Sequence, residues 1–331
     1  MSKGNNITEF DLINDYFSGM TRRRRDVLLG IGDDAALIRV PKGMDLALSV
    51  DTLVAGVHFF PEIPPADLGY KVLAVNLSDL AAMGAEPAWV TLALTIPQID
   101  DQWIAGFCSG FTELATRFDL QLVGGDTTAG PLSVTVQVQG LIPAGEGLRR
   151  SGAVAGDDIY VTGGLGDAAL ALRCKQQGTD QREDMEQLSM RLDRPVPRVE
   201  AGIALRGIAS SAIDISDGLV AELGHILKSS GVGARVTLDN LPMSPAVAAA
   251  LEESGDWAMV VAGGDDYELC FTVPPERRDQ LAGIEKQAGV AITRIGVVEA
   301  RAGLRCLHGD GSLWQPDRGG FEHFANGSGQ Y

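Results

Sequence analysis

The sequence is poor in cysteine, in positive charge and in long apolar runs. Its four cysteines, Cys108, Cys174, Cys270 and Cys306, lie far apart and form no CxxC pair, which argues against a zinc ribbon or a redox motif. We therefore expect buried or free thiols in a reducing cytoplasm. The 27 Lys and Arg residues against 44 Asp and Glu residues give a net charge of −17, which disfavours nucleic acid and anionic membranes as partners.

No segment resembles a secretion leader or a membrane span. The first ten residues, MSKGNNITEF, contain no apolar core of the kind that a leader needs. The most apolar stretch, residues 71–94, is interrupted by Asn76, Asp79 and Glu86, so it does not form an uninterrupted spanning helix. We expect a soluble protein.

The common nucleotide-binding motifs are missing or weak. The dipeptide Gly-Lys does not occur, which excludes a Walker A loop, and the HRD and DFG motifs of protein kinases are absent. The pattern GxGxxA occurs at 30–35 and at 164–169, and the second copy follows a predicted strand and opens a predicted helix. A lone match of this kind is weak evidence, so dinucleotide binding is kept as a minor alternative.

The length of 331 residues and the hydrophobic content of 45% suit two globular domains. Alternating and β-branched residues predict strands at 46–57 and 133–141, and apolar periodicity predicts helices at 67–84 and 101–117. Strands and helices also alternate beyond residue 157. The pattern is typical of a mixed α/β or α+β fold.

A segment rich in glycine, residues 142–157, is the best candidate for a domain junction. It divides the chain into predicted domains at 1–147 and 148–331. Residues 178–194 are polar, and we expect them to form a surface excursion. Four consecutive arginines at 22–25 indicate either an anion patch or a solvated helix end, and we favour the helix end.

Aspartates recur in glycine-bounded turns at the ends of predicted strands. One such aspartate is usually a turn cap, but five clusters in one chain suit Mg²⁺, which is typically held by a few carboxylates and by substrate phosphates. The neighbouring glycines would let backbone N–H groups approach an anionic ligand. The pattern therefore indicates phosphoryl chemistry. The clusters are GIGDDAAL (30–37), SVDT (49–52), VGGDTT (123–128), AIDISDG (212–218) and AGGDDYEL (262–269).

Asp79 occupies an apolar position of the predicted helix at 67–84. Leu68, Val72 and Val75 mark the apolar face, and Asp79 is the next position on it. A carboxylate that faces the interior needs a cation or several hydrogen-bond donors beside it. Asp79 is therefore either a metal ligand or a buried cap or salt-bridge residue.

Seven ordered motifs resemble those of the thiamine-monophosphate kinases, which belong to the superfamily of aminoimidazole-ribonucleotide (AIR) synthetase. The resemblance runs from about residue 5 to the closing GGFEHF at 319–324. The motifs are GIGDDAAL, SVDTLVAGVHF, KVLAVNLSDLAAMGAEP, VGGDTTAGP, RRSGAVAGDDIYVTG, SAIDISDGL and GGDDYEL.

The resemblance implies a cytoplasmic homodimer that phosphorylates thiamine monophosphate to thiamine diphosphate by direct in-line transfer from ATP. It implies several Mg²⁺ ions and leaves a K⁺ requirement open. The fold that the resemblance implies has two domains. The N-terminal AIR-synthetase-like domain forms a barrel-like sheet across a dimer, and the C-terminal domain is α/β. No general base is required, because a phosphate oxygen of the acceptor is already ionised.

The resemblance also assigns individual residues. Catalytic roles fall to Asp126, Asp214 and Asp217, nucleotide contacts to Gly125, Asp126, Arg150 and Ser216, and thiamine contacts to His58, Asp265 and Phe321. The implied metal ligands are Asp33, Asp34, Ser49, Val50, Asp51, Asp79, Asp126, Asp214 and Asp217.

Some of these residues have simpler alternatives or depart from the family pattern. His58 could be a strand-end residue, Phe321 a core aromatic and Asp265 a turn cap. Val50 stands where the family often has a hydroxyl, so only its backbone carbonyl could bind a metal, and Asp265 stands where glutamate is common.

Besides dinucleotide binding, two alternative functions are kept. AIR synthetase is the enzymatic one, and the other is a non-enzymatic cation-binding module built from the aspartate turns.

Overall fold

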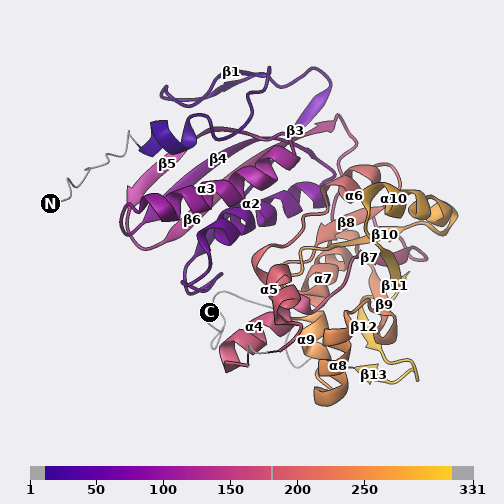
Figure 1. Cartoon of the computed structure of the whole chain (residues 1–331). Coiled ribbons are helices and arrows are strands. Elements are labelled where there is room, and N and C mark those ends of the chain that lie inside the picture. The colour runs from indigo at the N-terminus through magenta and orange to yellow at the C-terminus, as the bar shows by residue number, and fades with distance from the viewer. Residues whose placement is uncertain (1–11, 180–181, 315–331) are drawn as a thin grey trace. The chain divides into compact units, whose positions relative to one another are not determined.

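The computed structural model describes residues 12–179 and 182–314, which fold into two compact units (Figure 1). Unit 1 contains the described residues up to Asn76 together with Pro87–Ala144. Unit 2 contains Leu77–Glu86 and the described residues from Gly145 onward. The mixed helix and sheet content predicted from the sequence is confirmed in both units.

Unit 1 is built on a four-stranded sheet. Its strand order is β3 (Met44–Val54), β6 (Ser133–Pro143), β4 (Glu86–Ile96) and β5 (Gln121–Ala129). Strands β3 and β6 pair antiparallel along their full lengths, whereas β4 and β5 run parallel. A parallel pair needs a crossover connection, which helix α3 (Asp101–Arg117) supplies.

Helices α2 (Pro65–Ala82) and α3 cover one face of this sheet and lie side by side (Figure 1). Helix α3 begins where the side chain of Asp100 accepts hydrogen bonds from the amides of Gln102 and Trp103. Helix α2 is buried on nearly every side, and even Lys71 is 1% exposed. Because polar and apolar positions of α2 are buried alike, its apolar stripe does not mark a single interior face. Asp79, which the stripe placed in the interior, is half-buried.

A small hairpin of β1 (Val27–Leu29) and β2 (Leu37–Ile38) precedes the sheet. Val27 and Ile38 pack against a buried cluster that contains Trp89 and Leu141. The arginines at 22–25 lie in irregular chain between the short π-helix η1 (Ile13–Phe17) and β1. The expectation of a solvated helix end is therefore wrong.

Unit 2 contains a seven-stranded sheet in which β7 pairs antiparallel with β10 and β11. Among the strand pairs of this sheet in the described residues, only β9 and β12 run parallel. A dinucleotide fold needs parallel strands around its glycine loop, so the GxGxxA match at 164–169 does not form one. The order is β13 (Leu313–Trp314), β12 (Gly303–Leu307), β9 (Gly233–Thr237), β11 (Ile292–Glu299), β7 (Asp158–Thr162), β10 (Leu269–Val273) and β8 (Ser211–Asp214).

The polar segment at 178–194 is not only a surface excursion. It contains helix α5 (Met185–Asp193), which packs on α4 (Asp167–Gln177) and buries Met185, Leu188 and Leu192. The charged residues between these positions hid the apolar spacing. The other helices of unit 2 are α6 (Val199–Ala204), α7 (Leu219–Ser230), η2 (Leu238–Asn240), α8 (Pro245–Ser254), α9 (Trp257–Val261), η3 (Pro275–Gln280) and α10 (Leu281–Ala288).

The four cysteines are free and buried, as the sequence predicts. Burial raises the pKa of the Cys108 and Cys270 thiols to about 12. Across the part of the chain that the structure describes, no helix has the length and apolar character needed to cross a bilayer.

The close approach of α2 and α3 yields a first prediction. A Cβ at Gly110 would lie 1.8 Å from the carbonyl oxygen of Ala66, so Gly110→Ala forces the helices apart. We expect a loss of about 1–3 kcal/mol in the free energy of unfolding, measured by chemical denaturation. Gly283→Ala in α10 is the matched control, because no atom lies within 4 Å of its added Cβ. Equal stability of the two variants would contradict this account of the packing.

Candidate functional site

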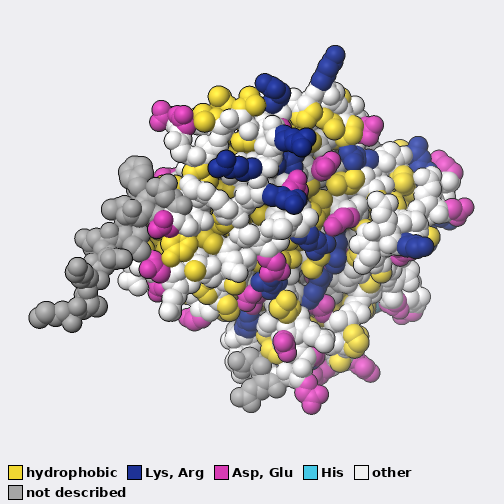
Figure 2. Space-filling view, turned by 45° about the horizontal axis from the view of Figure 1, so that its top comes forward, with side chains coloured by type: hydrophobic (Ala, Val, Ile, Leu, Met, Phe, Trp, Pro, Cys, Tyr) yellow, Lys and Arg dark blue, Asp and Glu magenta, His cyan; other side chains and the backbone are white. Residues whose placement is uncertain are grey.

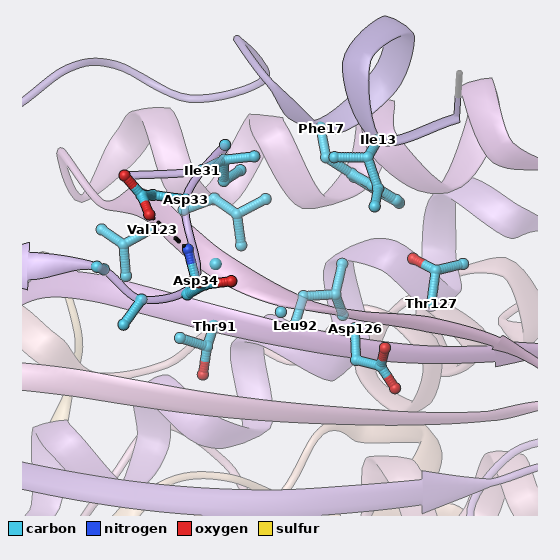
Figure 3. A pocket seen from close by; sticks show the side chains of 16 residues that line it. Ile13, Phe17, Ile31, Asp33, Asp34, Thr91, Leu92, Val123, Asp126 and Thr127 are labelled. Atoms are coloured by element: carbon cyan, nitrogen blue, oxygen red, sulfur yellow. Dashed lines mark hydrogen bonds between the residues drawn. The ribbon is translucent and has the colours of Figure 1, made fainter. Parts of the chain in front are cut away.

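One pocket of unit 1 has a volume of about 730 Å³ (Figure 3). The turn between β1 and β2 forms one wall, and β4 and β5 supply Thr91, Leu92 and the segment 122–127. Ile13 and Phe17 of η1 close the apolar side. The pocket therefore joins two of the five aspartate clusters, GIGDDAAL and VGGDTT.

Three predicted metal ligands line this pocket. Asp33 and Asp34 come from the β1–β2 turn, where an oxygen of the Asp33 carboxylate accepts a hydrogen bond from the Asp34 amide at 2.9 Å. Asp126 comes from the exposed part of β5 (Figure 3). All three carboxylates are exposed, so the pocket presents a negatively charged, water-accessible wall.

Glycine is required at Gly125 for a packing reason that the sequence did not indicate. A Cβ there would lie 1.8 Å from the carbonyl oxygen of Leu92 on the neighbouring strand. At Gly124, by contrast, no atom lies within 4 Å of an added Cβ. The open space that we expected near Asp126 is therefore beside Gly124. Gly125 instead allows β5 to lie close to β4.

Strand β3 carries three further predicted ligands on two faces. Ser49 and Asp51 are half-buried, whereas Val50 between them is 56% exposed and lies on the opposite face. The amide of Asp51 donates a hydrogen bond to the side chain of Asn76 on α2 at 3.1 Å. The side chain of Val50 therefore points away from the face shared by its two neighbours.

His58 lies in the turn after β3. Its Nδ1 accepts a hydrogen bond from the amide of Val54 at 3.0 Å, and its own amide donates to the carbonyl oxygen of Val54 at the same distance. The imidazole thus fixes the end of the strand, which is the simpler role that the sequence left open for this residue.

In unit 2, like charges meet at the end of β8. Asp214 is 5% exposed and accepts a hydrogen bond from the hydroxyl of Ser78 at 2.8 Å. Burial and the negative charge of Asp79 raise the pKa of Asp214 to about 8. Two carboxylates held together in this way are favourable sites for a cation.

Glu222 is a residue of this region that sequence reasoning missed. It is 5% exposed, accepts a hydrogen bond from the Ser216 hydroxyl at 3.1 Å, and has its pKa raised by burial and by the charge of Asp217, while the positive charge of Arg150 opposes this rise. Its position could have been found, because Leu219, Leu223 and Glu222 share one face of α7. The structure thus groups Arg150, Ser216 and Asp217 around a carboxylate.

The GGDDYEL loop runs beside the loop that follows β8. The amide of Asp265 donates to the carbonyl oxygen of Ser216 at 2.7 Å, and the amide of Tyr267 donates to the carbonyl oxygen of Ile215 at 2.8 Å. Asp265 and Tyr267 adopt positive φ values of 60° and 50°, which are uncommon for non-glycine residues. The Tyr267 hydroxyl also donates to the Asp265 carboxylate at 3.1 Å.

A buried ion-pair network anchors this loop. Glu268 is fully buried, and Arg198 and Arg191 both donate to its carboxylate. Burial alone would raise the pKa of Glu268, but the hydrogen bond and charge of Arg198 and the charge of Arg191 lower it below its usual value. Asp266, also buried, accepts a hydrogen bond from the Gly166 amide at 2.9 Å.

Eight of the predicted site residues therefore form two sets, each within one unit, whereas Ser49, Val50, Asp51 and His58 belong to neither set. Unit 1 brings Asp33, Asp34, Gly125 and Asp126 into one pocket, and unit 2 places Asp214, Ser216, Asp217 and Asp265 on adjoining loops. Among residues 12–179 and 182–314, no group of three His, Cys, Asp or Glu side chains converges closely enough to hold a metal unaided. Phe321 lies outside the described residues.

Comparison with known proteins identifies the class of this chain. Residues 32–142 match the family model of the AIR synthase related protein N-terminal domain, and residues 154–308 match that of the C-terminal domain. The fold and site thus define an AIR-synthase-related protein, as the sequence motifs predict.

The similarity to individual relatives is close over nearly the whole chain. The thiamine-monophosphate kinase of Salmonella typhimurium is 51% identical over 320 residues, which cover 96% of this chain and 98% of that protein. The crystal structure of the thiamine-monophosphate kinase from Stenotrophomonas maltophilia K279a is 47% identical, with a TM-score of 0.85 over 92% of this chain and 97% of that one. The chain belongs to the thiamine-monophosphate kinase family.

A third relative was solved with ligands. The structure of AaThiL complexed with AMPPCP and TMP has a TM-score of 0.76 and 28% identity, and it covers 98% of this chain and 99% of that chain.

The buried pair of unit 2 generates a pH prediction. The folded-state pKa of Asp214 lies above its ordinary value, so its ionisation opposes folding increasingly as the pH rises from about 4 to about 8. With EDTA present, we expect Asp214→Asn to raise the thermal unfolding midpoint at pH 8.5 and to change it far less at pH 5. A shift of the same size at both pH values would show that this carboxylate is not the titrating group.

Proposed function

We propose that this chain is a phosphotransferase that moves the γ-phosphoryl group of ATP directly to the phosphate of thiamine monophosphate, forming thiamine diphosphate. The observation that carries the proposal is its 51% identity, over 96% of its length, to a thiamine-monophosphate kinase. The relative solved with AMPPCP and TMP supports ATP and thiamine monophosphate as the two reactants. A cytoplasmic location is part of the proposal, since ATP is the donor and the four cysteines are free thiols.

The donor set fits Mg²⁺. Hydrated Mg²⁺ is usually held by one or two carboxylates together with substrate phosphates, so the lack of a three-ligand cluster among the described residues suits this ion. When bound, Mg²⁺ neutralises phosphate charge during the transfer. The residues proposed to hold it are Asp33, Asp34, Ser49, Asp51, Asp79, Asp126, Asp214, Asp217 and the backbone carbonyl of Val50. A K⁺ requirement is tested by omitting K⁺ from the same assay.

The remaining residues bind and orient the two anionic reactants. Arg150 offers a planar guanidinium to phosphate oxygens, and Gly125, Asp126 and Ser216 are proposed as further nucleotide contacts. His58, Asp265 and Phe321 are proposed for the thiamine moiety, whose positive ring suits a carboxylate and an aromatic wall. The acceptor phosphate oxygen is already ionised, so these residues need to position it rather than remove a proton.

The defining assay combines the protein with ATP, Mg²⁺ and thiamine monophosphate and follows ADP and thiamine diphosphate. We expect one thiamine diphosphate for each ADP. Turnover of formylglycinamidine ribonucleotide instead would assign the chain to the AIR synthetase reaction. Stabilisation by Mg²⁺ with no effect of ATP and no turnover would indicate a cation-binding module.

Asp126 is the sharpest test of the site. Asp126→Asn keeps the size of this exposed side chain but removes its charge, so we expect kcat to fall at least about a hundredfold with an unchanged unfolding midpoint. Asp279→Asn, at an exposed aspartate of η3, is the control and should retain full activity. Near-normal turnover of Asp126→Asn would remove this residue from the catalytic set.

We also propose that the chain forms a homodimer through the sheet face of unit 1 opposite α2 and α3. Three apolar residues of β3, Leu46, Leu48 and Val50, are 40%, 59% and 56% exposed on that face. Leu48 and Val50 lie beside Gln139 and Gln137 of β6, and Gln139 has a buried side-chain oxygen without a hydrogen-bond partner among the described residues. Exposed apolar rows of this kind mark interaction surfaces.

Charge on this face should prevent assembly. We expect Leu48→Lys to shift the sedimentation coefficient from that of a dimer to that of a monomer, because a desolvated ammonium group at an apolar contact is costly. Val154→Lys, at a residue of unit 2 that is 62% exposed, is the control and should leave the dimer intact. A parent protein that sediments as a monomer would overturn the dimer proposal while leaving the proposed reaction untouched.

A further inference from the structure

Unit 1 contains a second concave site, here called the arginine groove, which the proposed reaction does not use. It has a volume of about 770 Å³ and is lined by Arg22, Arg23, Arg24, Arg25, Asp26, Arg39, Pro41 and Asp119. Figure 2 shows Lys and Arg side chains, in dark blue, from the top of the visible face down through its centre. In a chain with a net charge of −17, five arginines in one groove are an unusual concentration of positive charge.

Arg24 is a structural member of the groove. Its guanidinium donates two hydrogen bonds to the Asp26 carboxylate, at 3.1 and 2.8 Å, and a third to the carbonyl oxygen of Asp119 at 3.1 Å. It also lies 5.7 Å from the ring centroid of Trp89. These contacts fix the side chain of Arg24 and neutralise most of the negative charge of Asp26.

Three other arginines have no such role. Within residues 12–179 and 182–314, the side chains of Arg23, Arg25 and Arg39 are exposed and form no ion pair or hydrogen bond. Arg22 makes one exposed contact, 3.6 Å from Asp119, and exposed pairs of this kind contribute little. Five arginines against two aspartates leave the groove with a net charge of +3.

The backbone holds these side chains in place at the base of the β1–β2 hairpin. Arg25 lies just before β1 and Arg39 just after β2, and the amide of Arg39 donates to the carbonyl oxygen of Asp26 at 2.8 Å. The amide of Arg24 donates to the side chain of Gln121 at 2.5 Å, which ties the segment to β5. The positive charges are therefore presented from a fixed frame.

We propose that the arginine groove binds a compact inorganic oligophosphate, an anion with at least three negative charges. Guanidinium groups match phosphate oxygens in geometry and lose little hydration on binding. The surrounding negative charge repels long polyanions such as nucleic acid, whereas a small anion can lie wholly within the groove. Apart from Pro41, the described lining residues are charged, so the groove offers no aromatic ring on which a nucleotide base could stack.

Calorimetric titration with inorganic tripolyphosphate tests the proposal. EDTA is present throughout, so that binding through Mg²⁺ is excluded and the result does not depend on the proposed kinase reaction. We expect the parent to bind one tripolyphosphate and the triple variant Arg23→Gln, Arg25→Gln, Arg39→Gln to bind it at least about tenfold more weakly. Binding should weaken as KCl rises from 50 to 200 mM.

Matched controls separate the groove from general charge effects. The triple variant Lys228→Gln, Lys286→Gln, Arg301→Gln removes three exposed cations of unit 2 and should bind as the parent does. The groove variant should keep its circular dichroism spectrum, since its three side chains have no partners within the described chain. If it does not fold, the double variant Arg23→Gln, Arg25→Gln serves as the test.

Several results would overturn the proposal. These are no tripolyphosphate binding by the parent, equal loss in both triple variants, or undiminished binding by the groove variant. ATP that binds the parent more tightly than tripolyphosphate in EDTA, and binds the groove variant more weakly than the parent, would assign the groove to a nucleotide. A twenty-nucleotide single strand binding more tightly than tripolyphosphate would assign it to nucleic acid.

Discussion

The ion pairs of Glu268 are the interaction on which the loops of unit 2 depend. A carboxylate buried this deeply is strongly disfavoured unless it is paired, so Arg191 and Arg198 determine where residues 262–268 can lie. Backbone hydrogen bonds from Asp265 and Tyr267 then set the course of the loop after β8. The positions of the unit 2 carboxylates on these loops thus follow from a salt bridge that includes none of them.

The elements with a clear period could be predicted from the sequence. The helix at 101–117 and the strand beginning at 133 lie where the pattern placed them, because their burial follows their own side chains. Helix α5 was missed because charged residues separate its three buried positions. The Glu268 network could not be predicted, because its partners are 70 and 77 residues away in the chain and no local pattern records such a pairing.

The candidate site shows the same division. The residue patterns identified the aspartate turns individually, and only the family resemblance assigned Asp33 and Asp126 to one ligand set; no local pattern shows that the turn containing Asp33 and the strand containing Asp126 line one pocket. That grouping depends on how the β1–β2 hairpin packs on the sheet. The net charge of −17 likewise does not show where the charges lie. Carboxylates gather at strand ends, whereas the arginine groove is positively charged.

Strand β3 places two unrelated demands on adjacent residues. Ser49 and Asp51 share one face of the sheet, and Leu46, Leu48 and Val50 share the other. Inserting or deleting a single residue within 46–51 would exchange the two faces. Hydroxyl and carboxylate groups would then occupy the apolar face, and apolar side chains would occupy the polar face. Selection should therefore remove insertions and deletions in this strand even where it tolerates single substitutions. Among related chains, the length of this strand should vary less than its residue types.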